Sequence, residues 1–206
     1  MPIWPCPWLG PSPLDINVNA CGTLGRVRPA SHRHDPEETA VTDTPTIEQL
    51  DELGIIHRRT VPAEFEDLNG HVNVRHHYTL HMEGAHTVFA DELRVDEERA
   101  ARGEGTFSLS QYIRFASEIL VGHDVSVHWR VLDRSDKIIH GMTILADRTT
   151  GKVASTSEFI EAFVDLNTRR VAPMPQDLAD LLDKLLATHR ELPWELPLSE
   201  PLAVRR

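Results

Sequence analysis

The spacing of apolar residues changes along this chain from a helical period to an alternating one, and the change divides its central part into elements. Residues 73–93 form the one long proline-free segment of helical character in this region, and Gly84 weakens the middle of the predicted helix. Beyond Gly105 apolar and polar residues alternate, which is typical of strands. The four predicted strands start and end near residues 107–115, 125–131, 138–145 and 153–164.

Weaker signals add three elements. Thr44 suits a helix N-cap, Pro45 a first helical turn and Gly54 a helix end, so a short helix is expected over 45–53. A strand is expected to follow at about 55–66. Near the C-terminus five leucines repeat at the spacing of an amphipathic helix, namely Leu178, Leu181, Leu182, Leu185 and Leu186.

These elements predict an α+β fold. Short turns at 133–136 and 149–152 connect consecutive strands, so the four strands are expected to form an antiparallel meander with the long helix over one face. Such a sheet leaves open edges and an uncovered face, and pairing with a second copy would close them.

The two ends of the chain differ from the middle. Residues 1–43 lack a sustained period and hold seven of the fourteen prolines, so they are expected to be a disordered N-terminal segment. The folded domain is then predicted at 44–174, followed by the C-terminal amphipathic helix and tail at 175–206.

Composition narrows the function. Of the 206 residues 40% are hydrophobic, enough for a buried core, and no apolar run approaches the roughly 20 residues that span a bilayer. The net charge of −11 argues against binding to nucleic acid or to an anionic membrane. Both cysteines, Cys6 and Cys21, lie near the N-terminus and no signal peptide is evident, so a cytoplasmic location is expected.

The densest polar chemistry lies where the first strand gives way to the long helix, in the run Asp67-Leu68-Asn69-Gly70-His71-Val72-Asn73. A helix start presents backbone N–H groups and the positive end of the helix dipole. We expect the N–H groups of residues 70–74 to be unpaired, so that they can polarise a carbonyl oxygen while Asp67 attacks the carbon or activates water. Asp67 could instead serve only as a helix cap.

The neighbours of Asp67 have open roles. His71 could orient the carboxylate, bind substrate or pack at the helix start, and Asn73 could hold the turn or position water. Two further histidines, His77 and His81, share one helix face, but the spacing typical of zinc hydrolases is absent and no metal site is predicted. Glu158 lies inside an apolar strand, and the sequence does not fix the face to which it points.

The motif Asp67-x-x-Gly70-His71-Val72-Asn73, followed by a long helix and four antiparallel strands, resembles the hotdog-fold acyl-CoA thioesterases of the 4-hydroxybenzoyl-CoA thioesterase type. In particular, it is similar to a subgroup found with carnitine and betaine metabolism, and the stretch from Ala154 to Pro175 supports this. The resemblance covers about residues 55–175. It implies an antiparallel sheet wrapped around one long central helix.

The resemblance also implies a function. We expect a cytoplasmic homodimer or homotetramer that hydrolyses a small or medium acyl-CoA without a metal or organic cofactor. The resemblance places the catalytic aspartate on Asp67, and we add His71 and Asn73 as catalytic candidates. Substrate contacts are expected from six further residues, Asn69, Gly70, Val72, His77, Tyr78 and Glu158.

One departure from the family concerns the acyl pocket. His77 stands where the family usually has an aromatic residue, and the helix also holds His76, His81 and His86, so a more polar pocket is expected. Two alternatives remain open at this stage. One is a hotdog hydratase or dehydratase that acts on enoyl-CoA, and the other is a non-catalytic dimer that binds acyl-CoA or a partner protein.

Overall fold

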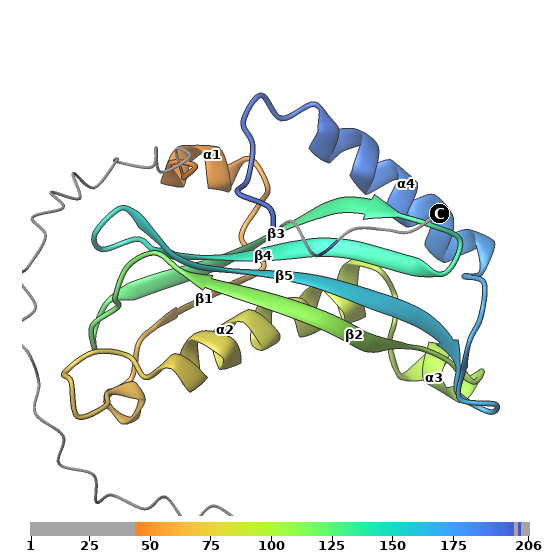
Figure 1. Cartoon of the computed structure of the whole chain (residues 1–206), viewed down its shortest axis with the longest axis horizontal. Helices are drawn as coiled ribbons and strands as arrows, with labels where there is room; N and C mark the ends of the chain where they lie inside the picture. The colour runs from red at the N-terminus through yellow and green to blue at the C-terminus, as the bar shows by residue number, and fades with distance from the viewer. Residues whose placement is uncertain (1–43, 200–201, 203–206) are drawn as a thin grey trace, which may run out of the picture. The chain divides into compact units, whose positions relative to one another are not determined.

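The computed structural model describes residues 44–199 and 202, so the prediction for residues 1–43 lies outside the described part. A curled antiparallel sheet has one long helix under one face (Figure 1). The helical elements are α1 (Ile47–Asp51), the 3₁₀ turn η1 (Ala63–Phe65), α2 (Val74–Thr87), the π-helical turn η2 (Val88–Glu92), α3 (Glu97–Ala101) and α4 (Gln176–Arg190). The strands are β1 (His57–Thr60), β2 (Glu104–Phe115), β3 (Asp124–Arg134), β4 (Ile138–Asp147), β5 (Lys152–Asp165) and β6 (Arg170–Val171).

All four alternating segments are strands, but they are not one meander. The order in the sheet is β1-β3-β4-β5-β2, with β6 paired to the end of β5. The meander is therefore limited to β3, β4 and β5, while β2 crosses to the far edge and pairs antiparallel with β5. The local period predicts a strand but does not choose its partner, because partner choice depends on contacts distant in sequence.

The long helix matches its prediction closely. Asn73 is the N-cap, its side chain accepts from Arg75 N at 3.1 Å, and the π-helical turn η2 extends the helix to Glu92. Gly84 has a packing reason, since a Cβ there would lie 2.7 Å from Val127 Cγ1. The glycine thus lets α2 approach the sheet at the point where it weakens helix propensity.

The predictions before α2 need correction. The N-cap of α1 is Thr46, not Thr44, because Thr46 and Gln49 form a reciprocal capping box. The first strand ends at Thr60 rather than near residue 66, and the chain then turns through η1. The short elements α3 and β6 were not predicted at all.

Different elements of the chain pack against the two faces of the sheet. On the inner face Val125, Val127 and Leu145 pack with Leu80 of α2. On the outer face Met142 and Ile144 pack with residues that come from α1 and from the segment after α4, namely Leu50, Trp194 and Leu196. Figure 1 shows α1 and α2 on opposite sides of the sheet, whereas Leu178, Leu182 and Leu186 of α4 pack in one core cluster with Trp129 of β3 and Val88 of η2.

Helix α4 closes part of an exposed strand edge. The predicted leucine stripe is confirmed, with Leu178, Leu182 and Leu186 buried. Strand β1 pairs with β3 only as far as Val127, and further along β3 the N–H of Val131 donates to His189 Nδ1 of α4 at 3.0 Å. A side chain of α4 thereby satisfies a backbone group that no strand covers.

Candidate functional site

The motif of the sequence forms a tight turn that leads into α2. The N–H of Asp67 donates to His71 O at 3.0 Å, and the N–H of Gly70 donates back to Asp67 O at the same distance. Gly70 has φ +79°, a backbone conformation that favours glycine, although a Cβ there would meet nothing within 4 Å. Its role is therefore to shape the turn rather than to allow a close approach.

Hydrogen bonds hold the Asp67 carboxylate at this turn. Oδ1 accepts from the N–H of Asn69 at 2.8 Å, and Oδ2 receives long bonds from the amides of Asn69 at 3.5 Å and Asn73 at 3.4 Å. The Asn69 backbone N–H, the charge of His71 and the two amides keep the pKa of Asp67 below its ordinary value, against the opposing effect of burial. The carboxylate is therefore ionised at neutral pH and suited to act as a nucleophile or base.

The helix start offers fewer open donors than the sequence suggested. Three of the five N–H groups are occupied, because Gly70 donates within the turn, Val72 to Ile119 O at 2.8 Å and Asn73 to Phe65 O at 2.9 Å. Among the described residues, the N–H groups of His71 and Val74 have no acceptor. The prediction of unpaired N–H groups at 70–74 is wrong for the other three, because tertiary contacts anchor the turn.

A cavity of about 360 Å³ lies beside this helix start. His71, Val72, Val74 and His77 line one side of it, and residues 115–118, at and just after the end of β2, line the other. The ring of Phe115 meets that of His77 edge-on at 5.3 Å. His71, Val72 and His77 are thus brought together, with Asp67 held by Asn73 at the same end of α2.

Behind His77 a row of buried polar side chains runs between α2 and the sheet. His77 Nδ1 lies 3.0 Å from Ser155 Oγ, which lies 2.9 Å from His81 Nε2. His81 Nδ1 lies 2.8 Å from Thr143 Oγ1. Burial lowers the pKa of His77 to about 4 and that of His81 to about 3, so both rings are neutral at neutral pH.

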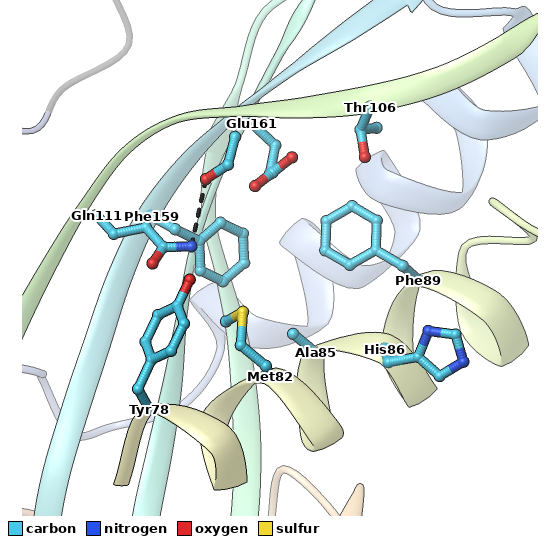
Figure 2. A pocket seen from close by; sticks show the side chains of 10 residues that line it. Tyr78, Met82, Ala85, His86, Phe89, Thr106, Gln111, Phe159 and Glu161 are labelled. Atoms are coloured by element: carbon cyan, nitrogen blue, oxygen red, sulfur yellow. Dashed lines mark hydrogen bonds between the residues drawn. The ribbon is translucent and has the colours of Figure 1, made fainter. Parts of the chain in front are cut away.

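A second cavity, of about 290 Å³, lies further along α2 under β2 and β5 (Figure 2). Its lining is mainly apolar and aromatic, with Tyr78, Met82, Phe89 and Phe159 around it. Glu161 extends into it, and burial raises the pKa of this carboxyl against the opposing effect of the Ser108 and Thr106 hydroxyls. Tyr78 therefore lines a different cavity from His77, although the two are adjacent in sequence.

The structure separates Glu158 from the other candidates. Glu158 pairs in register with Met142, so both side chains point to the outer face. Its carboxylate lies 2.7 Å from His140 Nε2 and accepts from Ser199 N at 2.6 Å. The expected substrate contact from Glu158 is not supported, because the whole sheet lies between it and α2.

Sequence reasoning missed Ser155, Thr143 and Glu161. A signal was present, since hydroxyl residues interrupt the apolar run of β4 at Thr143 and that of β5 at 155–157. Among the residues that the structure describes, no group of three or more His, Cys, Asp or Glu side chains is placed to hold a metal ion. Within the same part of the chain, no helix has the length and apolarity to cross a membrane.

Comparison with known families assigns the class. Residues 61–182 match the model of the Thioesterase-like superfamily, which is more than half of the chain, and the chain belongs to this superfamily. It is 26% identical over 133 residues to the betainyl-CoA thioesterase of Pseudomonas aeruginosa, an alignment of 65% of this chain and 84% of that protein.

A second relative is longer. The chain is 24% identical over 132 residues to the L-carnitine dehydrogenase/betainyl-CoA thioesterase of Rhizobium meliloti. This alignment covers 64% of the chain but spans only 26% of the length of that relative.

Solved structures agree on the fold. A Staphylococcus aureus protein in complex with CoA is 22% identical with a TM-score of 0.63, over 72% of this chain and 94% of that one. A 1,4-dihydroxy-2-naphthoyl-CoA thioesterase from Synechocystis is 15% identical with a TM-score of 0.56, over 64% of this chain and 96% of that one. The predicted hotdog fold is confirmed.

Proposed function

We propose that this protein is an acyl-CoA thioesterase whose reacting group is Asp67. The observation that carries the proposal is an ionised carboxylate held beside two open N–H groups, those of His71 and Val74, at the start of α2. Superfamily membership and relatives named as thioesterases support the same chemistry.

The reaction follows from this arrangement. The thioester carbonyl oxygen accepts hydrogen bonds from the helix start, where the dipole favours the negative charge that develops. Asp67 either attacks the carbonyl carbon or takes a proton from the attacking water, and the C–S bond then breaks. Because a thiolate is a good leaving group, no strong general acid is required.

The test is thiol release from a panel of acyl-CoAs by the full chain. Asp67→Asn keeps an oxygen that can accept from Asn69 N, so the turn is retained while the charge is lost. We expect kcat to fall by about 10²–10⁴-fold. Asp96→Asn is the matched control, since Asp96 caps α3 by accepting from Arg99 N at 3.0 Å in another part of the fold. Full activity of Asp67→Asn would refute the proposal, as would a chain that hydrates crotonyl-CoA and releases no thiol.

We also propose that the active form is a homodimer joined through β2. One edge of β2 has no partner strand in the described chain, and Leu109, Tyr112 and Phe115 on this strand are 56%, 42% and 49% exposed. Edge pairing with a second copy would cover both the backbone groups and these side chains. A monomer in sedimentation experiments at the assay concentration would contradict this.

We propose a cationic acyl group as the first substrate class to test. The relatives are named for betainyl-CoA, and the second cavity combines the aromatic rings of Tyr78, Phe89 and Phe159 with the Glu161 carboxyl. Aromatic faces and a carboxylate both attract a quaternary ammonium. Glu161→Gln should lower kcat/KM about tenfold for betainyl-CoA and leave that for a neutral acyl-CoA of equal size unchanged. Equal effects on both would refute the cationic assignment.

A further inference from the structure

The hydrogen-bond row behind His77 has a direction. Its far end is Thr143, whose Oγ1 lies 3.5 Å from Ser157 O, and a carbonyl oxygen only accepts. If the Thr143 hydroxyl donates there, its oxygen must accept the bond from His81 Nδ1, which therefore has a proton.

The remaining proton positions follow from this one. A neutral His81 protonated on Nδ1 has a bare Nε2, which can only accept from the Ser155 hydroxyl. Ser155 has a single proton, so its oxygen accepts from His77 Nδ1. Neutral His77 is then protonated on Nδ1 and presents a bare Nε2.

His77 Nε2 faces the site. It has no hydrogen-bond partner among the described residues, and it is not among their fully buried unpaired polar atoms. Because His77 lines the cavity at the helix start, that nitrogen is the part of the ring left to meet a bound molecule. His77 also lies one helical turn after Asn73, whose amide bonds Asp67.

We propose that Ser155, His81 and Thr143 fix the tautomer of His77, so that its Nε2 accepts a hydrogen bond from the water that hydrolyses the acyl group. The proposal rests on the thioesterase function. Water has two protons, one for the Asp67 carboxylate and one for the hydrogen bond to His77. The water oxygen forms the new C–O bond, the C–S bond breaks, and the proton taken by Asp67 passes to the departing thiolate. His77 gains and loses no proton in this scheme, which suits a ring that stays neutral.

The decisive variant is Thr143→Val, which keeps the shape of the side chain but removes the hydroxyl. His81 Nδ1–H would then be buried without an acceptor, so the His81 proton is expected to move to Nε2. The Ser155 hydroxyl must then reverse and donate to His77 Nδ1, and the proton of His77 moves to Nε2. The bare nitrogen of His77 at the cavity thereby becomes a donor. Thr143 itself is buried behind the site, so its substitution acts on that nitrogen through the row of hydrogen bonds.

Nitrogen NMR of histidine-labelled full chain reads the tautomer directly, and thiol release gives kcat. We expect the proton of His77 on Nδ1 in the parent, and on Nε2 in Thr143→Val with kcat about tenfold lower, the equivalent of one hydrogen bond. Thr143→Ser keeps the hydroxyl and should change neither. Ser155→Ala interrupts the row of hydrogen bonds at a second place. We expect this variant to have a mixture of His77 tautomers and a similar loss of kcat.

Each contrary result is informative. A parent protein with the His77 proton on Nε2 would overturn the proposal without any activity measurement, as would a Thr143→Val protein that folds and keeps the parent tautomer. If the tautomer changes but kcat does not, the contact to water is refuted. If neither parent nor variants release thiol while the NMR result holds, the thioesterase function fails and the catalytic part of this proposal with it.

Discussion

Buried histidines lie on both faces of the same sheet, and the inner pair His77 and His81 differs from His140 on the outer face in its partners. On the inner face His77 and His81 bond only to neutral hydroxyls, and the row reaches the cavity at the helix start. On the outer face His140 bonds to the carboxylate of Glu158, which the segment after α4 also covers through Ser199 N.

The comparison separates two uses of the same residue type. The Glu158 carboxylate joins His140 to the segment after α4, so this pair holds the outer layer together. A buried imidazole bonded to hydroxyls on one side keeps a nitrogen for a ligand on the other. We therefore expect variants on the outer face to change stability, and variants on the inner face to change catalysis or its pH dependence.

The largest effect is expected on the outer face. Glu158→Ala leaves His140 and the N–H of Ser199 buried without their acceptor, and breaking such a pair costs about 3–5 kcal/mol. Urea unfolding should show this loss, while kcat of the folded fraction stays at the parent value.

Glu158→Gln is the control for that variant. Its amide can still accept from Ser199 N and donate to His140, so the loss should be smaller. A large fall in kcat for either variant would contradict the assignment of Glu158 to a structural role.

The contrast between Glu158 and its neighbour also shows where sequence reasoning ends. The alternation in β5 is evident in the sequence, but the sequence does not tell whether its odd- or even-numbered residues face α2. Glu158 was therefore chosen as a site residue and Glu161 was missed. They lie three positions apart and therefore on opposite faces. Only packing against α2 and α1 decides between them.

Local sequence signals predicted the geometry of the motif better. Asp67, Gly70 and the cap Asn73 lie within seven residues, so turn chemistry and the helix start predict their proximity. The pairing of β2 with β5, the occupied N–H groups of Val72 and Asn73, and the row from His77 to Thr143 all depend on residues far apart in sequence. No local period encodes such contacts.

An intermediate effect is expected from pH on the inner face. Folding lowers the pKa of His77 to about 4 and that of His81 to about 3, whereas in the unfolded chain both are near 6.5. The unfolded chain therefore binds more protons as pH falls from 6.5 to 4, and the free energy of unfolding decreases there by up to about 1.4 kcal/mol per pH unit for each ring. Above pH 6.5 this stability is fully present.

His81→Leu isolates one ring in that measurement. His189, whose pKa burial and the charge of Arg130 lower to about 4, adds to the slope in every variant, so only the difference is used. Urea unfolding at several pH values should give a shallower slope for His81→Leu, whatever its absolute stability. Parallel curves would show that His81 is not buried as a neutral ring.

The smallest effect is expected from His71, the histidine whose charge acts on the reacting carboxylate. After the larger contribution of the Asn69 N–H, the charge of His71 helps keep the pKa of Asp67 low. His71→Ala should raise that pKa, so the acid limb of kcat/KM moves to higher pH. The shift is small because the hydrogen bonds to Asp67 remain and because solvent and salt screen the charge.

At about 1 M salt, where the screening length is only about 3 Å, the parent and variant profiles should converge. His140→Gln, a change on the outer face that keeps a hydrogen bond to Glu158, should leave the limb in place at every salt concentration. Two results would show that His71 acts on the site by contact rather than by charge. One is an acid limb of kcat/KM that does not move in His71→Ala, and the other is a difference between the parent and variant profiles that remains at high salt.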